Sequence, residues 1–371
     1  MVALALAAAA RDAPPTSLQP LDPAPCAGVI DTLFNATALP DRAAWRAAIH
    51  AAQHPPDCAS APLCTCGKVH ADGSRVHGQT TSELHADMSC LLRSGVEGCT
   101  LVAASEPAAP PAEAEGAACV GAHGVAPCYL QRLGACSAAD AAAAPRVLAS
   151  PQRIADVRAL CDAARARWGV ADTLACFGEV AAYVARPAEA VRRAVHELAA
   201  ALALGECAGR VPLNATVAVH VRHGDKLLYH TDGNTEAHAA LALAHATARG
   251  LRAVHFMSDS LAARAVFAAH LQRSGNETLA VRAVPEALQV FTGESNLSAH
   301  RQFLAAPPAA MDQEVLLLAE TILMAQSDVL VGPQVSNVDR LVAELMASLR
   351  ERPVVDDVDN VTWFDRRGGV Y

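Results

Sequence analysis

Apolar and polar positions alternate in blocks along the second half of the chain. Short runs rich in β-branched residues, typical of buried strands, lie at 217–221, 252–257, 279–284 and 329–331. Longer stretches with apolar residues at helical spacing follow them at 236–249, 261–272, 311–325 and 337–350. Strands that alternate with helices predict a parallel sheet with right-handed crossovers, so we expect a Rossmann-like α/β domain over residues 206–371.

The first half of the chain shows no such alternation of strand and helix patterns. A proline-rich stretch within residues 1–30 is typical of a stem or linker. Residues 82–104 have the pattern of a helix followed by a short strand. A helical pattern runs over residues 151–204, with a break at Arg186-Pro187. We expect residues 31–205 to form a separate α/β domain on the N-terminal side.

Composition narrows the class of protein. A length of 371 residues accommodates two domains of ordinary size, and 52% hydrophobic with 18% charged residues excludes a disordered chain. The formal charge of −9 and the pI of 5.9 argue against nucleic acid as the main partner, because a phosphate-tracking surface is basic. No Gly-x-Gly-x-x-Gly follows a predicted strand, which argues against a dinucleotide-dependent oxidoreductase.

All cysteines lie in the first 207 residues, which predicts that the N-terminal half is held by disulfide bonds. The twelve are Cys26, Cys58, Cys64, Cys66, Cys90, Cys99, Cys119, Cys128, Cys136, Cys161, Cys176 and Cys207. A zinc site is the alternative, because Cys64 and Cys66 lie near His70, His77 and His85 in the sequence. No second paired-cysteine element follows, so disulfides are the better interpretation.

Glycosylation signals, like the cysteines, indicate the secretory pathway. Five of the seven asparagines begin an Asn-x-Ser/Thr triplet: Asn35, Asn214, Asn276, Asn296 and Asn360. These signals and the cysteines predict a protein of the secretory pathway. The first ten residues are apolar but too short to span a bilayer and have no basic flank, so no membrane anchor is visible and we expect an anchor or signal to be missing from this sequence.

One segment carries most of the candidate chemistry. The run from Val217 to Lys226 begins as an apolar strand and ends in a cluster of polar and charged residues. Arginine offers a planar fork of donors to a phosphate, lysine adds a point charge, and a neighbouring aspartate can orient both cations. Ligands of α/β enzymes bind beyond the carboxyl ends of strands, so this cluster predicts a phosphate-binding site. The alternative is a strand followed by a solvated charged turn.

As a string, His220-Val221-Arg222-His223-Gly224-Asp225-Lys226 resembles the His-x-Arg-x-x-Asp-Lys motif of the α1,6-fucosyltransferases, the core fucosyltransferases of glycosyltransferase family 23. The resemblance implies a GT-B-like fold, with a Rossmann-like C-terminal domain that binds GDP-fucose and a disulfide-rich α/β N-terminal part. It implies that Arg222 grips the donor diphosphate and that His220, His223, Asp225 and Lys226 line the donor site. It also implies a disulfide between Cys90 and either Cys64 or Cys66.

Two further segments are similar to the same family. The run from His255 to Ser260 resembles its second motif, which implies that Asp259 lies beside the nucleotide. The segment around residues 325–331 and the pair Ser336-Asn337 resemble its third, which implies that Ser336 and Asn337 contact the diphosphate from a helix N-terminus. Ser336 could equally be a plain helix cap. Glu320 stands where the family has a donor-contacting aspartate.

The chain also departs from the family pattern. His223 replaces the second of two adjacent arginines in the animal enzymes, and Gly332 and Asp339 replace a flanking cysteine pair. The place of the catalytic glutamate is held by Tyr229-His230, and Thr235-Glu236-Ala237 matches the family's Thr-Glu-Ala only if a short segment is inserted. Glu236 is therefore the first candidate for the catalytic base and His230 the second. We expect no counterpart of the family's C-terminal SH3-like domain.

The resemblance implies an inverting transfer of fucose from GDP-fucose to a glycan, most simply to the core GlcNAc of an N-glycan in the Golgi lumen. Arg222 and Lys226 would stabilise the leaving diphosphate, so we expect no metal or other cofactor. Two alternatives remain open. One is a protein O-fucosyltransferase-like enzyme with a folded protein domain as acceptor. The other is a lumenal nucleotide-sugar- or glycan-binding pseudoenzyme without transfer activity.

Overall fold

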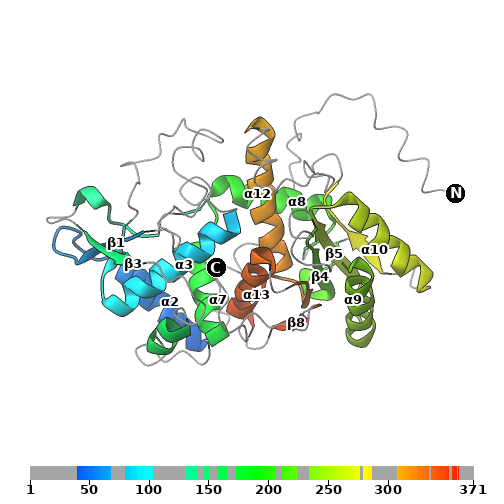
Figure 1. Ribbon diagram of the computed structural model, residues 1–371, viewed down its shortest axis with the longest axis horizontal. Helices are drawn as coiled ribbons and strands as arrows, with labels where there is room; N and C mark the ends of the chain where they lie inside the picture. The colour runs from blue at the N-terminus through cyan, green and yellow to red at the C-terminus, as the bar shows by residue number, and fades with distance from the viewer. Residues whose placement is uncertain are drawn as a thin grey trace.

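The computed structural model describes residues 40–67, 80–102, 130–131, 133–140, 145–149, 158–164, 173–205, 210–223, 234–275, 279–285, 307–333, 336–350, 353–356 and 358. The protein is an α/β structure with two parallel sheets, one of three strands and one of five. The two sheets lie toward opposite ends of the long axis, with helices between them (Figure 1).

The five-stranded sheet belongs to the second half of the chain. Its strands are β4 (Thr216–Val221), β5 (Ala253–Ser258), β6 (Ala280–Arg282), β7 (Val329–Val331) and β8 (Val354–Asp356). They are parallel and lie in the order β6-β5-β4-β7-β8. The predicted parallel sheet and the α/β class are thus confirmed, and this strand order is compatible with a Rossmann-like fold.

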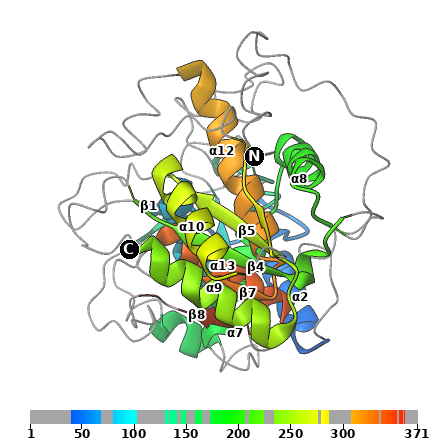
Figure 2. The same cartoon turned by 90° about the vertical axis from the view of Figure 1, so that its right-hand side faces the viewer.

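Helices cover both faces of this sheet. On one face lie α9 (Thr235–Arg249), which packs on β4, and α10 (Leu261–Arg273), which packs on β5; both share a core with Val217 and Val219. On the other lie α12 (Pro307–Met324) and α13 (Asn337–Leu349), which share a core with Ala218. Figure 2 shows α9 and α10 in front of the strands, with α12 and α13 behind. Strands buried on both faces explain why the runs in the sequence are continuously apolar.

The three-stranded sheet belongs to the first half of the chain. Strands β1 (Leu63–Gly67), β2 (Thr100–Leu101) and β3 (Arg146–Ala149) lie in the order β2-β1-β3. Helix α3 (Thr80–Glu97) precedes β2, as the helix-then-strand pattern predicted. Helix α2 (Pro40–Gln53) packs against β2. The predicted break at Arg186-Pro187 is also confirmed, because it separates α7 (Thr173–Val184) from α8 (Glu189–Ala201).

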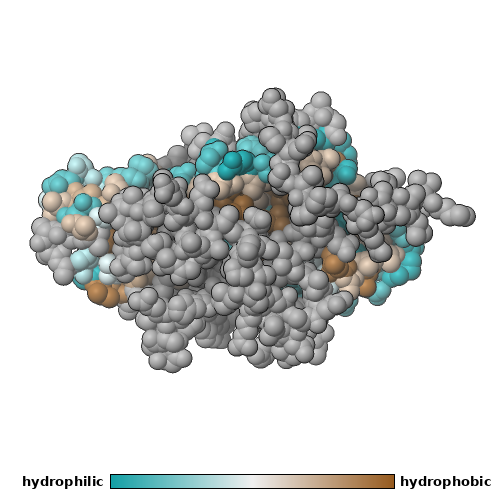
Figure 3. Space-filling view, turned by 90° about the horizontal axis from the view of Figure 1, so that it is seen from above, coloured by the Kyte–Doolittle hydropathy of each residue, from teal (hydrophilic) through white to brown (hydrophobic). Residues whose placement is uncertain are grey.

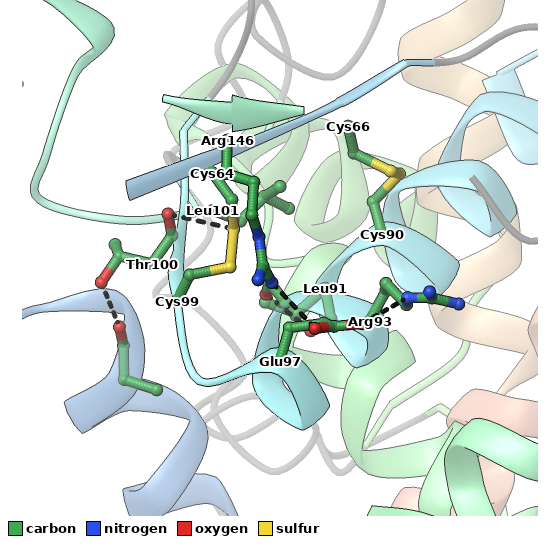
Figure 4. The surroundings of a disulfide bond; sticks show 12 residues. Cys64, Cys66, Cys90, Leu91, Arg93, Glu97, Cys99, Thr100, Leu101 and Arg146 are labelled. Carbon is green, nitrogen blue, oxygen red and sulfur yellow. Dashed lines mark hydrogen bonds and ion pairs between the residues drawn. A yellow bond between two sulfur atoms is a disulfide. The ribbon is translucent and has the colours of Figure 1, made fainter. Parts of the chain in front are cut away.

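Disulfide bonds hold this first half together. Four pairs form among the described cysteines: Cys58–Cys136, Cys64–Cys99, Cys66–Cys90 and Cys161–Cys176. Two of them tie β1 to its neighbours, since Cys66 reaches α3 and Cys64 reaches the turn before β2 (Figure 4). In the same region Glu97 accepts from both Arg93 and Arg146. The prediction of disulfides is confirmed, and of the two partners implied for Cys90 the structure has Cys66.

The zinc alternative is excluded by the same bonds. Zinc binds thiolates, and Cys64 and Cys66 are both in disulfides. His85 contacts the Thr81 carbonyl oxygen and the Glu344 carboxylate instead. Cys26, Cys119, Cys128 and Cys207 lie outside the described residues, as do His70 and His77.

Helix α13 joins the two halves. It is buried on all sides from Val338 to Ser348, and its most extensive contacts are with α7 of the first half (Figure 1). Gly178 of α7 permits this approach, because a Cβ there would lie 2.8 Å from the Glu344 carbonyl oxygen and 2.8 Å from the Ser348 nitrogen. The largest hydrophobic core therefore contains residues from both halves of the chain.

Few large apolar side chains reach the surface of the described part. Only Val147 and Val266 are exposed, and Figure 3 shows apolar residues in small separate groups on the face it presents. Among the described helices, none has the length and apolarity needed to cross a bilayer. The disulfides fit an oxidising compartment such as the lumen of the secretory pathway.

Candidate functional site

The strand order creates one special point on the five-stranded sheet. The chain starts at the central strand β4, builds β5 and β6 outward on one side, and then returns to build β7 and β8 on the other. The connections after β4 and β7 therefore leave in opposite directions. Ligands of open α/β sheets bind beyond the carboxyl ends of the strands at such a switch point. The polar side chains at the ends of β4, β5 and β7 are therefore the candidates for a ligand site.

Arg222 is held at this edge by Asp259. It comes directly after β4, and its Nη1 donates to Asp259 Oδ2, directly after the neighbouring strand β5. Asp259 Oδ1 also accepts from the His223 backbone N–H at 2.8 Å. Both side chains of the ion pair are about nine-tenths buried, at 12% and 10% exposure. A guanidinium fixed in this way loses little conformational entropy when it binds an anion.

Serines fix the end of β5 beside this pair. The Ser258 hydroxyl donates to the Val221 carbonyl oxygen at 2.7 Å and accepts from the Ser260 N–H. The Ser260 hydroxyl accepts from Ala263 N and caps α10. Asp259 lies between these two serines, so its carboxylate is held by backbone that is bonded on both sides.

The N-terminus of α13 lies at the same edge, beyond β7. Ser336 is its N-cap, and the Ser336 hydroxyl accepts from Val338 N at 3.2 Å. Asn337 Oδ1 accepts from Arg340 Nη2. The first turn of a helix presents backbone N–H groups and a partial positive charge, both of which favour an anion. In the structure Ser336 acts as a helix cap.

His220 lies beneath this edge. Its ring is buried, with 3% of the side chain exposed, and Nδ1 lies 2.5 Å from Oδ2 of Asp339 in the first turn of α13. Gly332, directly after β7, completes the contact. A Cβ at this position would lie 2.0 Å from Asp339 Oδ1 and 3.3 Å from the His220 carbonyl oxygen. The ends of β4 and β7 and the start of α13 therefore meet at one point, where a side chain at position 332 would clash with the Asp339 carboxylate.

Glu320 lies away from the edge, in the layer between α12 and the sheet. Its nearest charged neighbour is His255 of β5, with Nε2 3.9 Å from Glu320 Oε1. Both side chains are buried, and neither these atoms nor His255 Nδ1 has a hydrogen-bond partner among the described residues. The structure brings Glu320 into contact range of His255, not of Arg222.

Glu236, the first candidate base, is exposed on the first turn of α9. Its Oε1 accepts from Arg273 Nη2 at 2.8 Å, and more than half of each side chain is exposed. The residue before it, Thr235, has its hydroxyl 3.4 Å from His223 Nε2. The start of α9 thus lies next to His223, the residue after Arg222, although the Glu236 carboxylate is paired with Arg273. Asp225, Lys226 and His230 lie outside the described residues.

The sequence interpretation missed two partners in these contacts. Asp339 and His255 are buried polar residues bonded to, or facing, predicted site residues. The only signal for them in the sequence is a polar residue inside an otherwise apolar strand or helix, as His220 is in β4. In the described part of the chain, no three histidine, cysteine or carboxylate side chains converge as a group that could hold a metal.

No protein-family model matches the chain, and a search of curated proteins also gives no match.

Proposed function

We propose that the protein is an inverting glycosyltransferase that moves fucose from GDP-fucose to a glycan, with the core GlcNAc of N-glycans as the acceptor. The observation that carries the proposal is the position of Arg222. It lies at the switch point of a parallel sheet, oriented by Asp259, with a helix N-terminus at the same edge. A diphosphate at this edge would meet cationic and N–H donors from several directions.

Three motifs that are distant in the sequence support the resemblance to the core fucosyltransferases. The segments that end in Arg222, in Asp259 and in Ser336-Asn337 all terminate at one edge of one sheet. A shared donor site requires these segments at one edge, and the parallel pairing of β4 with β5 and β7 is compatible with that requirement. The second parallel sheet, in the disulfide-bonded first half, supports a GT-B-like arrangement as part of the proposal.

The contact at Gly332 gives independent support. Positions 332 and 339 hold a cysteine pair in the family that the chain resembles. Here a Cβ at Gly332 would lie 2.9 Å from Asp339 Cγ, so the two positions are close enough for side chains to touch. A disulfide requires that proximity. In this chain the glycine leaves room at that place for the Asp339 carboxylate.

The proposed reaction is a single displacement at the anomeric carbon. The acceptor hydroxyl oxygen bonds to that carbon, the bond to the GDP β-phosphate oxygen breaks, and the hydroxyl proton passes to a base. Arg222 stabilises the charge that grows on the leaving diphosphate. In the structure Glu236 Oε1 is paired with Arg273, so the carboxylate must turn toward the acceptor hydroxyl to take the proton.

A transfer assay tests this function. The intact protein is incubated with labelled GDP-fucose and, separately, with N-glycans or folded protein domains as acceptors. We expect labelled N-glycan with inverted anomeric configuration, one GDP released per transfer, and inhibition by GDP but not by UDP. Transfer to folded domains alone would instead identify a protein O-fucosyltransferase-like enzyme.

A binding protein without transfer activity is the second candidate, and the Glu236–Arg273 ion pair favours it. The base variants separate the two functions. If Glu236 is the base, Glu236→Gln keeps GDP affinity and lowers turnover by about 10²-fold, the usual scale for a lost general base. If His230 is the base, His230→Ala has that effect instead. Unmutated protein that binds GDP and transfers fucose to no acceptor would contradict the enzyme and support the binding protein.

A further inference from the structure

A buried histidine–aspartate pair connects the end of β4 with the first turn of α13 beside the proposed donor site. His220 is two residues before Arg222, and Asp339 is three residues after the cap of α13. Their side chains are 3% and 0% exposed, with Nδ1 and Oδ2 2.5 Å apart. Asp339 Oδ1 has no hydrogen-bond partner among the described residues. The ring of His220 is therefore the partner that holds this carboxylate.

The charge of Asp339 affects both the stability of the buried contact and the attraction of the α13 N-terminus for an anion. A buried carboxylate without a partner is strongly unfavourable, and this one lies within the first turn of the helix that would face a diphosphate. Unopposed, its negative charge would also cancel the attraction of the helix N-terminus for an anion. An N–H of His220 that donates to Oδ2 gives the carboxylate a partner and weakens its field at the helix N-terminus.

We infer that His220 and Asp339 are positioning residues: they fix the first turn of α13 against the end of β4 and keep its N-terminus able to accept an anion. His220 then acts through Asp339, because Nδ1 of its buried ring faces the first turn of α13. This inference rests on the proposed function for its effect on GDP, but its effect on the helix is independent of any ligand.

The same helix supplies a matched control. His85 of α3 lies 3.1 Å from Glu344 of α13, and both side chains are buried to the same degree as the first pair. Glu344 Oε1 likewise has no hydrogen-bond partner among the described residues. This second pair is in the middle of α13 and joins it to the first half of the chain. Its loss should destabilise the protein without loosening the first turn.

The experiment compares His220→Gln, Asp339→Asn and the double variant with His85→Gln in the full chain. Hydrogen exchange at the Arg340 amide, which donates to the Ser336 carbonyl oxygen at 3.1 Å, reports the first turn without nucleotide. Titration with GDP measures the affinity of the proposed donor site. We expect His220→Gln to speed exchange at Arg340 and weaken GDP about tenfold or more, the loss of one charge-assisted hydrogen bond. The double variant should recover part of both losses, because it also removes the buried charge.

A disulfide that replaces the His220–Asp339 contact distinguishes a loosened first turn from general misfolding of the variants. Gly332→Cys with Asp339→Cys should form a disulfide, since the two side chains would be in contact. When oxidised, this variant should protect the Arg340 amide like the unmutated protein, and reduction should remove the protection. Exchange at Arg340 that is unchanged in His220→Gln, or raised equally by His85→Gln, would overturn the inference. Unmutated protein that binds no GDP would contradict the proposed function alone, because the exchange measurements would still decide the role of the pair.

Discussion

The two sheets of this protein are stabilised in different ways. The five-stranded sheet is buried on both faces by helices, and its central strand β4 has no exposed residue. The three-stranded sheet has short strands, an exposed Val147 at 75%, and disulfides on β1 and beside it. An apolar core stabilises the five-stranded sheet, and covalent cross-links compensate for a smaller core around the three-stranded sheet. The polar residues of the proposed donor site are carried by the sheet with the large core.

The largest effect should come from the longest disulfide loop. Cys58–Cys136 spans 78 residues and Cys161–Cys176 spans 15. By chain entropy, replacing the first pair with serine should lower the free energy of unfolding by about 4.5 kcal/mol and the second by about 3 kcal/mol. Denaturant unfolding of the two double variants measures this order. A larger loss from the shorter loop would show that chain entropy does not stabilise the first half.

A core truncation should damage the five-stranded sheet independently of redox state. Phe256 of β5 is 2% exposed, and its ring centroid lies 4.7 Å from that of Phe267 of α10. Phe256→Ala should cost about 4 kcal/mol, and Phe256→Leu about 1.5 kcal/mol or less because it conserves volume. Both losses should be the same with and without reductant, measured by thermal or denaturant unfolding. A loss that appears only in the reduced protein would contradict the separate roles of core and disulfides.

A third variant tests how the two halves are joined. Gly178→Ala would place a Cβ 2.8 Å from backbone atoms of α13, so α7 and α13 must separate, at a cost of about 2 kcal/mol. Gly98→Ala is the control: its φ of 71° makes alanine unfavourable by about 1–2 kcal/mol, but nothing surrounds it within 4 Å. We expect Gly178→Ala to split unfolding into two transitions and Gly98→Ala to keep one. One transition in both would mean that the halves are joined elsewhere.

The sequence predicted the elements with long apolar or amphipathic runs and missed β1, β3 and β8. Strands β4, β5 and β7 and helices α9, α10 and α13 were predicted within a few residues, because long apolar or amphipathic runs report burial directly. β1 contains two cysteines and a threonine, β3 begins with an exposed arginine, and β8 has three residues. Such segments become strands through disulfides and neighbouring strands, which a local pattern does not contain.

The candidate site shows the same limit. The residues that end strands, such as Arg222 and Asp259, could be identified from position and charge. The pairing of His220 with Asp339 could not, because 119 residues separate them and only the fold brings them together. The ion pair of Glu236 with Arg273 is a further case, since two exposed side chains at separate helices carry no pairing signal in the sequence.

The most direct test of the proposed function is the affinity of the Arg222→Lys variant for GDP. An ammonium keeps the charge but lacks the planar fork, so we expect GDP to bind about 30-fold more weakly, or about 2 kcal/mol, in an isothermal titration. Arg249→Lys is the matched control, because Arg249 also pairs with an aspartate, Asp328, before β7 at the opposite edge of the sheet. It should bind GDP like the unmutated protein. Arg222→Lys protein that binds GDP with unchanged affinity would contradict the assignment of Arg222 to the diphosphate.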